Sequence, residues 1–153
     1  MLAEGLSLMA ISKNDQNILG ICLNKCKIKN KTPEYRDDKI GRFLNEVESG
    51  VNIWELGKTD RAFSINILAV SESSRGTGVG KALMEHSREK ARSAGYSLLY
   101  VLCTSYYSDR IARNMGMQCV YTLPYSEYKD EQGNPVFVPP APHTQATVLI
   151  EKL

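Results

Sequence analysis

The sequence predicts an α/β domain with a mixed central sheet, and three features carry that prediction. An apolar run, Ile65–Val70, is followed by a glycine-rich turn and then by a helical pattern that ends at Gly95. A second apolar run, Ser97–Cys103, comes directly after it. Two strands that are apolar on both faces and separated by one helix indicate a parallel βαβ unit. The 153 residues fit one domain, spanning 1–153.

Composition excludes several classes of protein. A net charge of +2 is too small to indicate a nucleic acid or an anionic membrane as a partner, and no apolar run approaches the length of a membrane span. The N-terminal residues lack the pattern of a signal peptide. The four cysteines form no Cys-x-x-Cys pair, which argues against a metal site and favours reduced thiols in a cytoplasmic protein.

The first half of the chain predicts a hairpin, a helix and the central strand. Apolar runs at Leu6–Ile11 and Ile18–Leu23 flank a polar turn, as in a β-hairpin. Thr32 is the expected helix cap, with Pro33 in the first turn and Gly50 as the stop. The apolar positions at helical spacing are Ile40, Phe43, Leu44 and Val47. A short segment, Val51–Leu56, then precedes the central strand, Arg61–Val70.

The second half predicts two helices and three strands. A helix over Gly78–Ala94 follows the turn, and its expected inner face consists of Val79, Ala82, Leu83, His86 and Ala91. After the second apolar strand come a short helix, Tyr107–Met115, and strands near Gln118–Leu123 and Thr144–Leu153. The last two strands are separated by a polar loop containing Gly133 and four prolines, and a loop of that length often shapes a site.

The glycine-rich turn predicts an anion site. A strand, a glycine turn and a helix N-terminus present unpaired amides and a favourable dipole, and Arg75 adds a charge-assisted contact. A nucleotide-hydrolase loop would need Ser or Thr where Ala82 stands, and the dinucleotide fingerprint would need Gly where Lys81 stands. The surviving pattern is Arg-Gly-x-Gly-x-Gly following Leu68-Ala69-Val70.

This pattern resembles the acyl-CoA pyrophosphate loop of the GNAT N-acetyltransferase superfamily, and the predicted order of elements resembles that fold from its second strand onward. Within the superfamily the chain looks most similar to insect-type arylalkylamine N-acetyltransferases. The segments that carry the resemblance are Ile67–Val70, Tyr106–Ala112, Met115–Met117, Tyr125–Tyr128, Gly133–Phe137 and Pro142-His143. The resemblance in the order of elements covers nearly the whole chain.

The resemblance implies acetyl-CoA as co-substrate and direct transfer to an amine within a ternary complex. It implies that the two apolar strands splay apart and that backbone groups of the first pair with the pantetheine amides. The implied cofactor-binding residues are Leu68, Ala69, Val70, Arg75, Gly76, Thr77, Gly78, Val79, Gly80, Tyr107 and Ser108.

The implied catalytic residues are Ser108 and Thr104. Many GNAT enzymes carry a tyrosine general acid four residues before the glycine of the short helix, and here that position is Ala112. In the insect-type group a serine nearer the helix start takes this role, which Ser108 matches, with Thr104 in a position to assist. Ser108 followed by Asp and Arg suits a helix N-cap equally well, and both roles could hold together.

The family's proposed general base is a Glu in a Glu-Pro-Leu-like motif, which this sequence lacks. Glu55, Asp60 and Glu72 are carboxylates near the region, and we expect them to be solvated surface charges. Because Met1 falls almost at the family's second strand, the fold is expected to be short at its N-terminus. We therefore expect acyl-CoA binding, poor turnover, and a monomer or weak self-association through the uncovered sheet.

The remaining aromatic and histidine residues leave alternatives open. Five aromatic side chains could line an aryl pocket or simply pack the sheet, namely Tyr121, Tyr125, Tyr128, Phe137 and Trp54. His143 is expected to cap a turn rather than support the site, and His86 to be a half-buried helix residue. The favoured substrate is a small arylalkylamine of the dopamine, serotonin or tyramine type. The alternatives are a polyamine or a protein lysine, or acyl-CoA binding without turnover.

Overall fold

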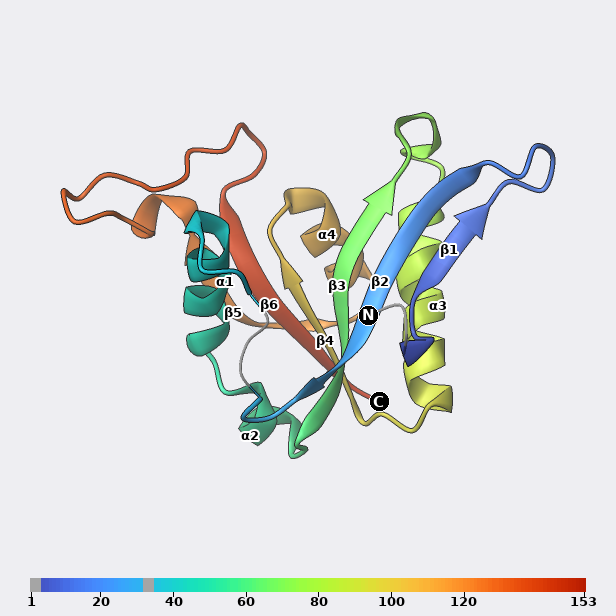
Figure 1. Ribbon diagram of the computed structural model, residues 1–153, viewed down its shortest axis with the longest axis horizontal. Coiled ribbons are helices and arrows are strands. Elements are labelled where there is room, and N and C mark those ends of the chain that lie inside the picture. Colours follow the sequence, from blue (N-terminus) through green and yellow to red (C-terminus); the bar gives the residue numbers. More distant parts are fainter. Residues whose placement is uncertain (1–3, 32–34) are drawn as a thin grey trace.

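The structure, a computed structural model, describes residues 4–31 and 35–153. Its centre is a six-stranded sheet in the order β1-β2-β3-β4-β6-β5. The strands are β1 (Leu8–Ile11), β2 (Ile18–Ile28), β3 (Arg61–Val70), β4 (Leu98–Cys103), β5 (Gln118–Pro124) and β6 (Gln145–Lys152). The α-helices are α1 (Lys39–Ser49), α2 (Ile53–Gly57), α3 (Val79–Ser93) and α4 (Tyr106–Asn114). In Figure 1, α1 and α2 lie at the left side of the sheet and α3 at the right.

The mixed sheet confirms the predicted fold class. Strands β3 and β4 pair in parallel and are joined by α3, which is the predicted βαβ unit. All other neighbours in the sheet are antiparallel. The apolar sequence of β4 explains its central place in the sheet. The strand is buried at nearly every position, and such a strand needs cover on both faces.

Strand β2 runs five residues further than the hydrophobic pattern predicted. The apolar run stops at Leu23 because the polar residue Asn24 follows it, yet Asn24 is fully buried. Its side-chain amide donates to Ser87 Oγ and to the Leu6 carbonyl, both at 3.0 Å. A buried polar group with its hydrogen bonds made costs little, so the strand continues through it.

Helix α1 begins later than expected. The predicted cap at Thr32 lies outside the described residues, and Asp38 caps the helix instead, with Oδ1 accepting from the Gly41 N–H at 2.8 Å. Gly50 does end the helix, as predicted, but its φ of −73° needs no glycine. A Cβ there would lie 2.2 Å from the Tyr121 ring, so close packing explains the residue.

The inner face of α3 is rotated relative to the prediction. Leu83 and Ala91 are buried as expected, but Ala82 and His86 are exposed. The buried set instead includes Met84 and Ser87. Ser87 was passed over because it is polar, although it is satisfied by Asn24.

The sheet carries a hydrophobic core on each face. The core under α3 and α4 is centred on Phe63, Met84 and Leu99. The core under α1 is centred on Phe43, Val47 and Leu98. Alternation along β3 and β4 therefore assigns Phe63 to the α3 side and Tyr100 to the α1 side.

Candidate active site

The parallel pair of strands separates half-way along β3. Pairing between β3 and β4 ends at Ile65 opposite Val101, although β3 continues to Val70. Beyond that point β3 pairs only with β2, and Asn66 forms a bulge in that pairing. Figure 1 shows β3 and β4 diverging toward the end of the sheet at which the glycine turn lies. The backbone edge of β3 from Ile67 onward therefore faces away from β2 with none of the described strands beside it, as the resemblance implied.

The glycine turn leads from this open edge into α3. Gly76 and Gly78 have φ of 77° and 89°, a left-handed conformation that favours glycine. Gly78 is the N-cap of α3 and provides no side-chain cap, so the first amides of the helix remain available to an anion. A Cβ at either glycine would meet nothing within 4 Å. Backbone torsion, and not crowding within the protein, thus accounts for both residues.

Helix α4 lies next to this turn. A Cβ at Gly80 would lie 3.3 Å from Ile111 Cδ1, so the start of α3 lies close against the middle of α4. Ile111 is one helical turn after Ser108, which places Ser108 on the helix adjacent to the predicted phosphate site. Arg75, Tyr106 and Tyr107 are exposed in the same region of the fold.

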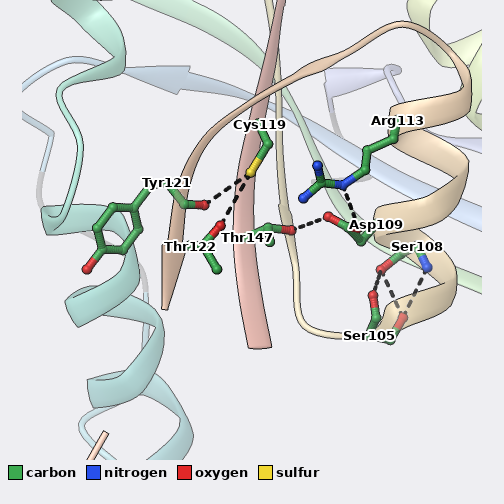
Figure 2. Close-up of polar contacts among 8 residues, drawn as sticks. All are labelled: Ser105, Ser108, Asp109, Arg113, Cys119, Tyr121, Thr122 and Thr147. Carbon is green, nitrogen blue, oxygen red and sulfur yellow. Dashed lines mark hydrogen bonds and ion pairs between the residues drawn. The ribbon is translucent and has the colours of Figure 1, made fainter. Parts of the chain in front are cut away.

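The N-cap of α4 is Ser105, which excludes the N-cap role expected for Ser108. Ser105 Oγ accepts from the Ser108 N–H at 3.2 Å, which is the N-cap bond (Figure 2). Ser108 is therefore a first-turn residue and not the cap, contrary to one of its two expected roles. Its hydroxyl lies 2.9 Å from Ser105 Oγ and donates to the Ser105 carbonyl at 3.2 Å. This short chain of hydroxyl groups fixes the position of Ser108 Oγ at the helix start.

The same helix is fastened to the sheet by Asp109. Figure 2 shows its carboxylate between two donors, with Thr147 Oγ1 at 2.6 Å on Oδ1 and Arg113 Nε at 2.7 Å on Oδ2. The bond to Asp109 raises the pKa of Arg113, which remains a cation. Because Thr147 belongs to β6, α4 is held against the strand next to β4. Ala112, on the inner side of α4, is fully buried in the core.

The C-terminal loop contacts both the start of α4 and the end of β4. His143 Nδ1 accepts from the Tyr106 N–H at 3.1 Å, and its ring meets Tyr107 edge-on at 5.5 Å. The Tyr125 hydroxyl donates to the Thr104 carbonyl at 2.6 Å. His143 therefore does more than cap a turn, because it joins the loop to the helix that carries Ser108.

Cys103 lies at the end of β4 but is not suited to act as a nucleophile. The residue is 1% exposed, and burial raises the pKa of its thiol to about 12. A thiol acts as a nucleophile only as the thiolate. Cys103 is therefore not suited to form an acyl-enzyme intermediate.

Aromatic side chains gather between α1 and the C-terminal loop. Phe43 lies 5.0–5.3 Å from the rings of Tyr125, Tyr128 and Phe137. Phe43 and Tyr125 are at most 9% exposed. These rings pack against one another, so the packing alternative holds for this part of the expected aryl set. Tyr121 packs under Gly50, and Trp54 joins the same core.

Chain comparison identifies the family. The Acetyltransferase (GNAT) family model matches residues 49–117. The structure is similar to arylalkylamine N-acetyltransferase 2 from Aedes aegypti, with a TM-score of 0.91 and 30% identity over 99% of this chain and 74% of that one. The chain belongs to the GNAT acetyltransferase family.

Two further solved structures extend the comparison of this GNAT enzyme. A Drosophila melanogaster polyamine N-acetyltransferase, described as forming N-acetylagmatine, has a TM-score of 0.84 and 25% identity over 99% of this chain and 76% of that one. The NatC complex bound to a Gag peptide and CoA has a TM-score of 0.57 and 16% identity over 97% and 71%, and shares the fold alone. GNAT enzymes use acetyl-CoA as donor and an amine as acceptor.

Several features of the GNAT enzyme bear on its chemistry. Among residues 4–31 and 35–153, no group of three or more His, Cys, Asp or Glu side chains could hold a metal ion. None of the described helices is long and apolar enough to cross a membrane. Glu55, Asp60 and Glu72 are all exposed, as expected for surface charges.

One charged residue near the site was missed from the sequence. Glu48, on α1, is 14% exposed and accepts hydrogen bonds from Lys27, Tyr35 and Tyr100. The signal that could have found it is its place one turn after Leu44 and beside Val47, on the buried side of an amphipathic helix.

Proposed function

We propose that this GNAT enzyme transfers the acetyl group of acetyl-CoA directly to a small arylalkylamine of the dopamine, serotonin or tyramine type. The observation that carries the proposal is the end of pairing between β3 and β4 at Ile65 and Val101, with the glycine turn following β3. An open parallel edge leading to a helix N-terminus fits a ligand with amides at one end and phosphates at the other.

The donor is proposed to lie along that edge. Backbone groups of Leu68, Ala69 and Val70 have β2 on one side and a vacant edge on the other, which suits hydrogen bonds to pantetheine. The pyrophosphate would meet the turn from Arg75 to Gly80, where the backbone of Gly76, Thr77 and Gly78 and the first amides of α3, at Val79 and Gly80, stabilise negative charge. Tyr107 would lie beside the pantetheine arm.

The transfer step is proposed to be direct. The acceptor ammonium first loses a proton to solvent, and the neutral amine nitrogen then attacks the thioester carbonyl. The carbon–sulfur bond breaks, the nitrogen gives its extra proton to solvent, and Ser108 donates a proton to the departing thiolate and is reprotonated from solvent, with Thr104 assisting. Binding both reactants in attack geometry removes much of the entropic barrier. The high pKa of the Cys103 thiol supports this route over one through an acyl-cysteine.

The acceptor class is the finer part of the proposal. Support comes from the similarity to the Aedes arylalkylamine enzyme. The second candidate is a polyamine or agmatine, favoured by the similarity to the Drosophila polyamine enzyme. Acetylation of a protein lysine and acyl-CoA binding without turnover are the remaining alternatives.

Two measurements test the proposal. Calorimetry with CoA measures the donor site directly, and acetyl-CoA turnover against dopamine, serotonin, tyramine, spermidine, agmatine and a lysine peptide ranks the acceptors. Highest kcat/KM with an arylalkylamine supports the proposal. Preference for spermidine or agmatine would show that the acceptor is a polyamine or agmatine and not an arylalkylamine. CoA binding with no turnover would indicate an acyl-CoA-binding protein.

A further inference from the structure

Glu48 is held by donors from three separate parts of the chain. Lys27 Nζ on β2 lies at 2.9 Å, the Tyr35 hydroxyl before α1 at 2.9 Å, and the Tyr100 hydroxyl on β4 at 3.0 Å. Burial raises the pKa of both Tyr35 and Tyr100, and the charge of Glu48 raises each further. Both hydroxyls therefore keep their protons at neutral pH and act as permanent donors.

All three donors meet the same carboxylate oxygen. Each bond ends on Glu48 Oε1, while Oε2 makes no hydrogen bond to any of the residues that the structure describes. A carboxylate has two oxygens and about four acceptor positions, so half of this group is unused by the described residues. Fixing one oxygen with three donors orients the other without occupying it.

Glu48 also stands on the side of the sheet opposite the donor helix. Its partner Tyr100 belongs to the core under α1, whereas the glycine turn leads into α3 on the other face. Tyr100 pairs with Ser64, one residue before the last pair between β3 and β4. Ser64 Oγ in turn bonds Asn66 Oδ1 at 2.6 Å, so polar side chains follow β3 into the point of divergence.

We propose that Glu48 is a specificity-determining residue that binds the amino group of the incoming acceptor through Oε2 while that group is still an ammonium, before it loses the proton that attack requires. The proposal rests on the proposed function, since it assigns the acceptor side of the same site. A charge-assisted hydrogen bond of this kind selects a cation over a neutral group of equal shape. It suits both arylalkylamines and polyamines, which share a primary ammonium.

Replacing Lys27 distinguishes a Glu48 that binds the acceptor from a Glu48 that only stabilises the fold. Its cation already balances part of the charge of Glu48, so an ammonium on Oε2 would be a second cation on one carboxylate. Removing Lys27 should therefore strengthen binding of a charged amine, because like charges repel. If the Lys27–Glu48 ion pair only held α1 on the sheet, replacing either residue would weaken binding of the amine.

The experiment measures binding to the full chain saturated with CoA. Phenylethylamine and phenylethanol are titrated by calorimetry into the wild type, Glu48→Gln, Lys27→Gln and a matched control, Glu46→Gln, at an exposed position of the same helix. We expect Glu48→Gln to weaken the amine at least about tenfold, the low end for a bond to a charged group, and to leave the alcohol nearly unchanged. Lys27→Gln should tighten the amine by about two- to tenfold, and Glu46→Gln should change neither.

The outcomes distinguish failure of the proposed function from failure of the proposed role of Glu48. Absence of CoA binding by the wild type would remove the proposed function and this inference together. With CoA bound, an equal loss of amine and alcohol in Glu48→Gln, or no loss of either, would overturn the role of Glu48 alone. Weaker amine binding in Lys27→Gln would do the same, and it remains decisive if Glu48→Gln fails to fold.

Discussion

The two sides of this site are built in different ways. The proposed donor side comes from one continuous stretch, β3 through α4, in which the strand, turn and helix follow one another along the chain. The proposed acceptor side is assembled from α1, β4 and the C-terminal loop, and one of its hydrogen bonds joins Glu48 to Tyr100, 52 residues away. Local order therefore specifies the donor side, whereas long-range packing specifies the acceptor side, and the two should fail separately.

The largest expected effect is on the acceptor side. Phe43 is 3% exposed and lies against three other rings, so Phe43→Ala should cost about 3–5 kcal/mol of unfolding free energy through lost packing and a cavity. Thermal and urea denaturation measure the loss. Calorimetry at low temperature, where the variant remains folded, should still give a CoA affinity close to that of the wild type. A parallel loss of CoA affinity would mean that the two sides are one cooperative unit.

The second prediction concerns the start of α4, where the proposed donor and acceptor sides meet. If Ser108 supplies the proton, Ser108→Ala should lower kcat at least about a hundredfold, the low end for a positioned proton donor, with little change in CoA affinity. Ser105→Ala is the matched control, since Ser105 is the cap of α4. It should lower the melting temperature, because losing a cap costs about 1 kcal/mol. The assignment is wrong if Ser108→Ala retains full turnover.

Features carried by neighbouring residues could be predicted from the sequence, whereas features that depend on distant contacts could not. The βαβ unit and glycine turn were predicted because neighbouring residues carry them, and the structure confirms the parallel pair. The extension of β2 through Asn24 was missed because its partner, Ser87, is 63 residues away. The helix cap was assigned to Ser108 as one alternative, although Ser105 suits that job by the same rule. Glu48 was overlooked because an acidic residue on an amphipathic helix is usually solvated, and only the fold brings its three donors together.

A smaller effect is expected at the donor side. Arg75 is exposed at the start of the glycine turn, and Arg75→Ala should weaken CoA binding by roughly 1–3 kcal/mol, the usual size of a lost charge-assisted bond. Gly78→Val should have a greater effect on CoA binding, because a β-branched residue strains at a φ of 89° and would block approach of a phosphate. Calorimetry with CoA measures both, and acceptor binding to the CoA-saturated protein should not change. Unchanged CoA affinity in both variants would remove the turn from the donor site.

The smallest expected effect is on Cys103, and it tests whether the two sides act without a covalent link. Cys103 ends β4 close to the point of divergence, where an acyl-enzyme nucleophile would have to stand. Burial raises the pKa of its thiol to about 12, so at pH 7 the side chain remains a thiol. Direct transfer needs no thiolate, and Cys103→Ala should keep kcat within about a factor of two while lowering stability by about 1 kcal/mol for the smaller buried side chain. Intact-mass measurement after mixing the wild type with acetyl-CoA alone should show no added acetyl group on this residue. A hundredfold loss of kcat in Cys103→Ala, or a stable acetyl adduct that an amine discharges, would show that the donor side passes the acetyl group through the protein before the acceptor side receives it.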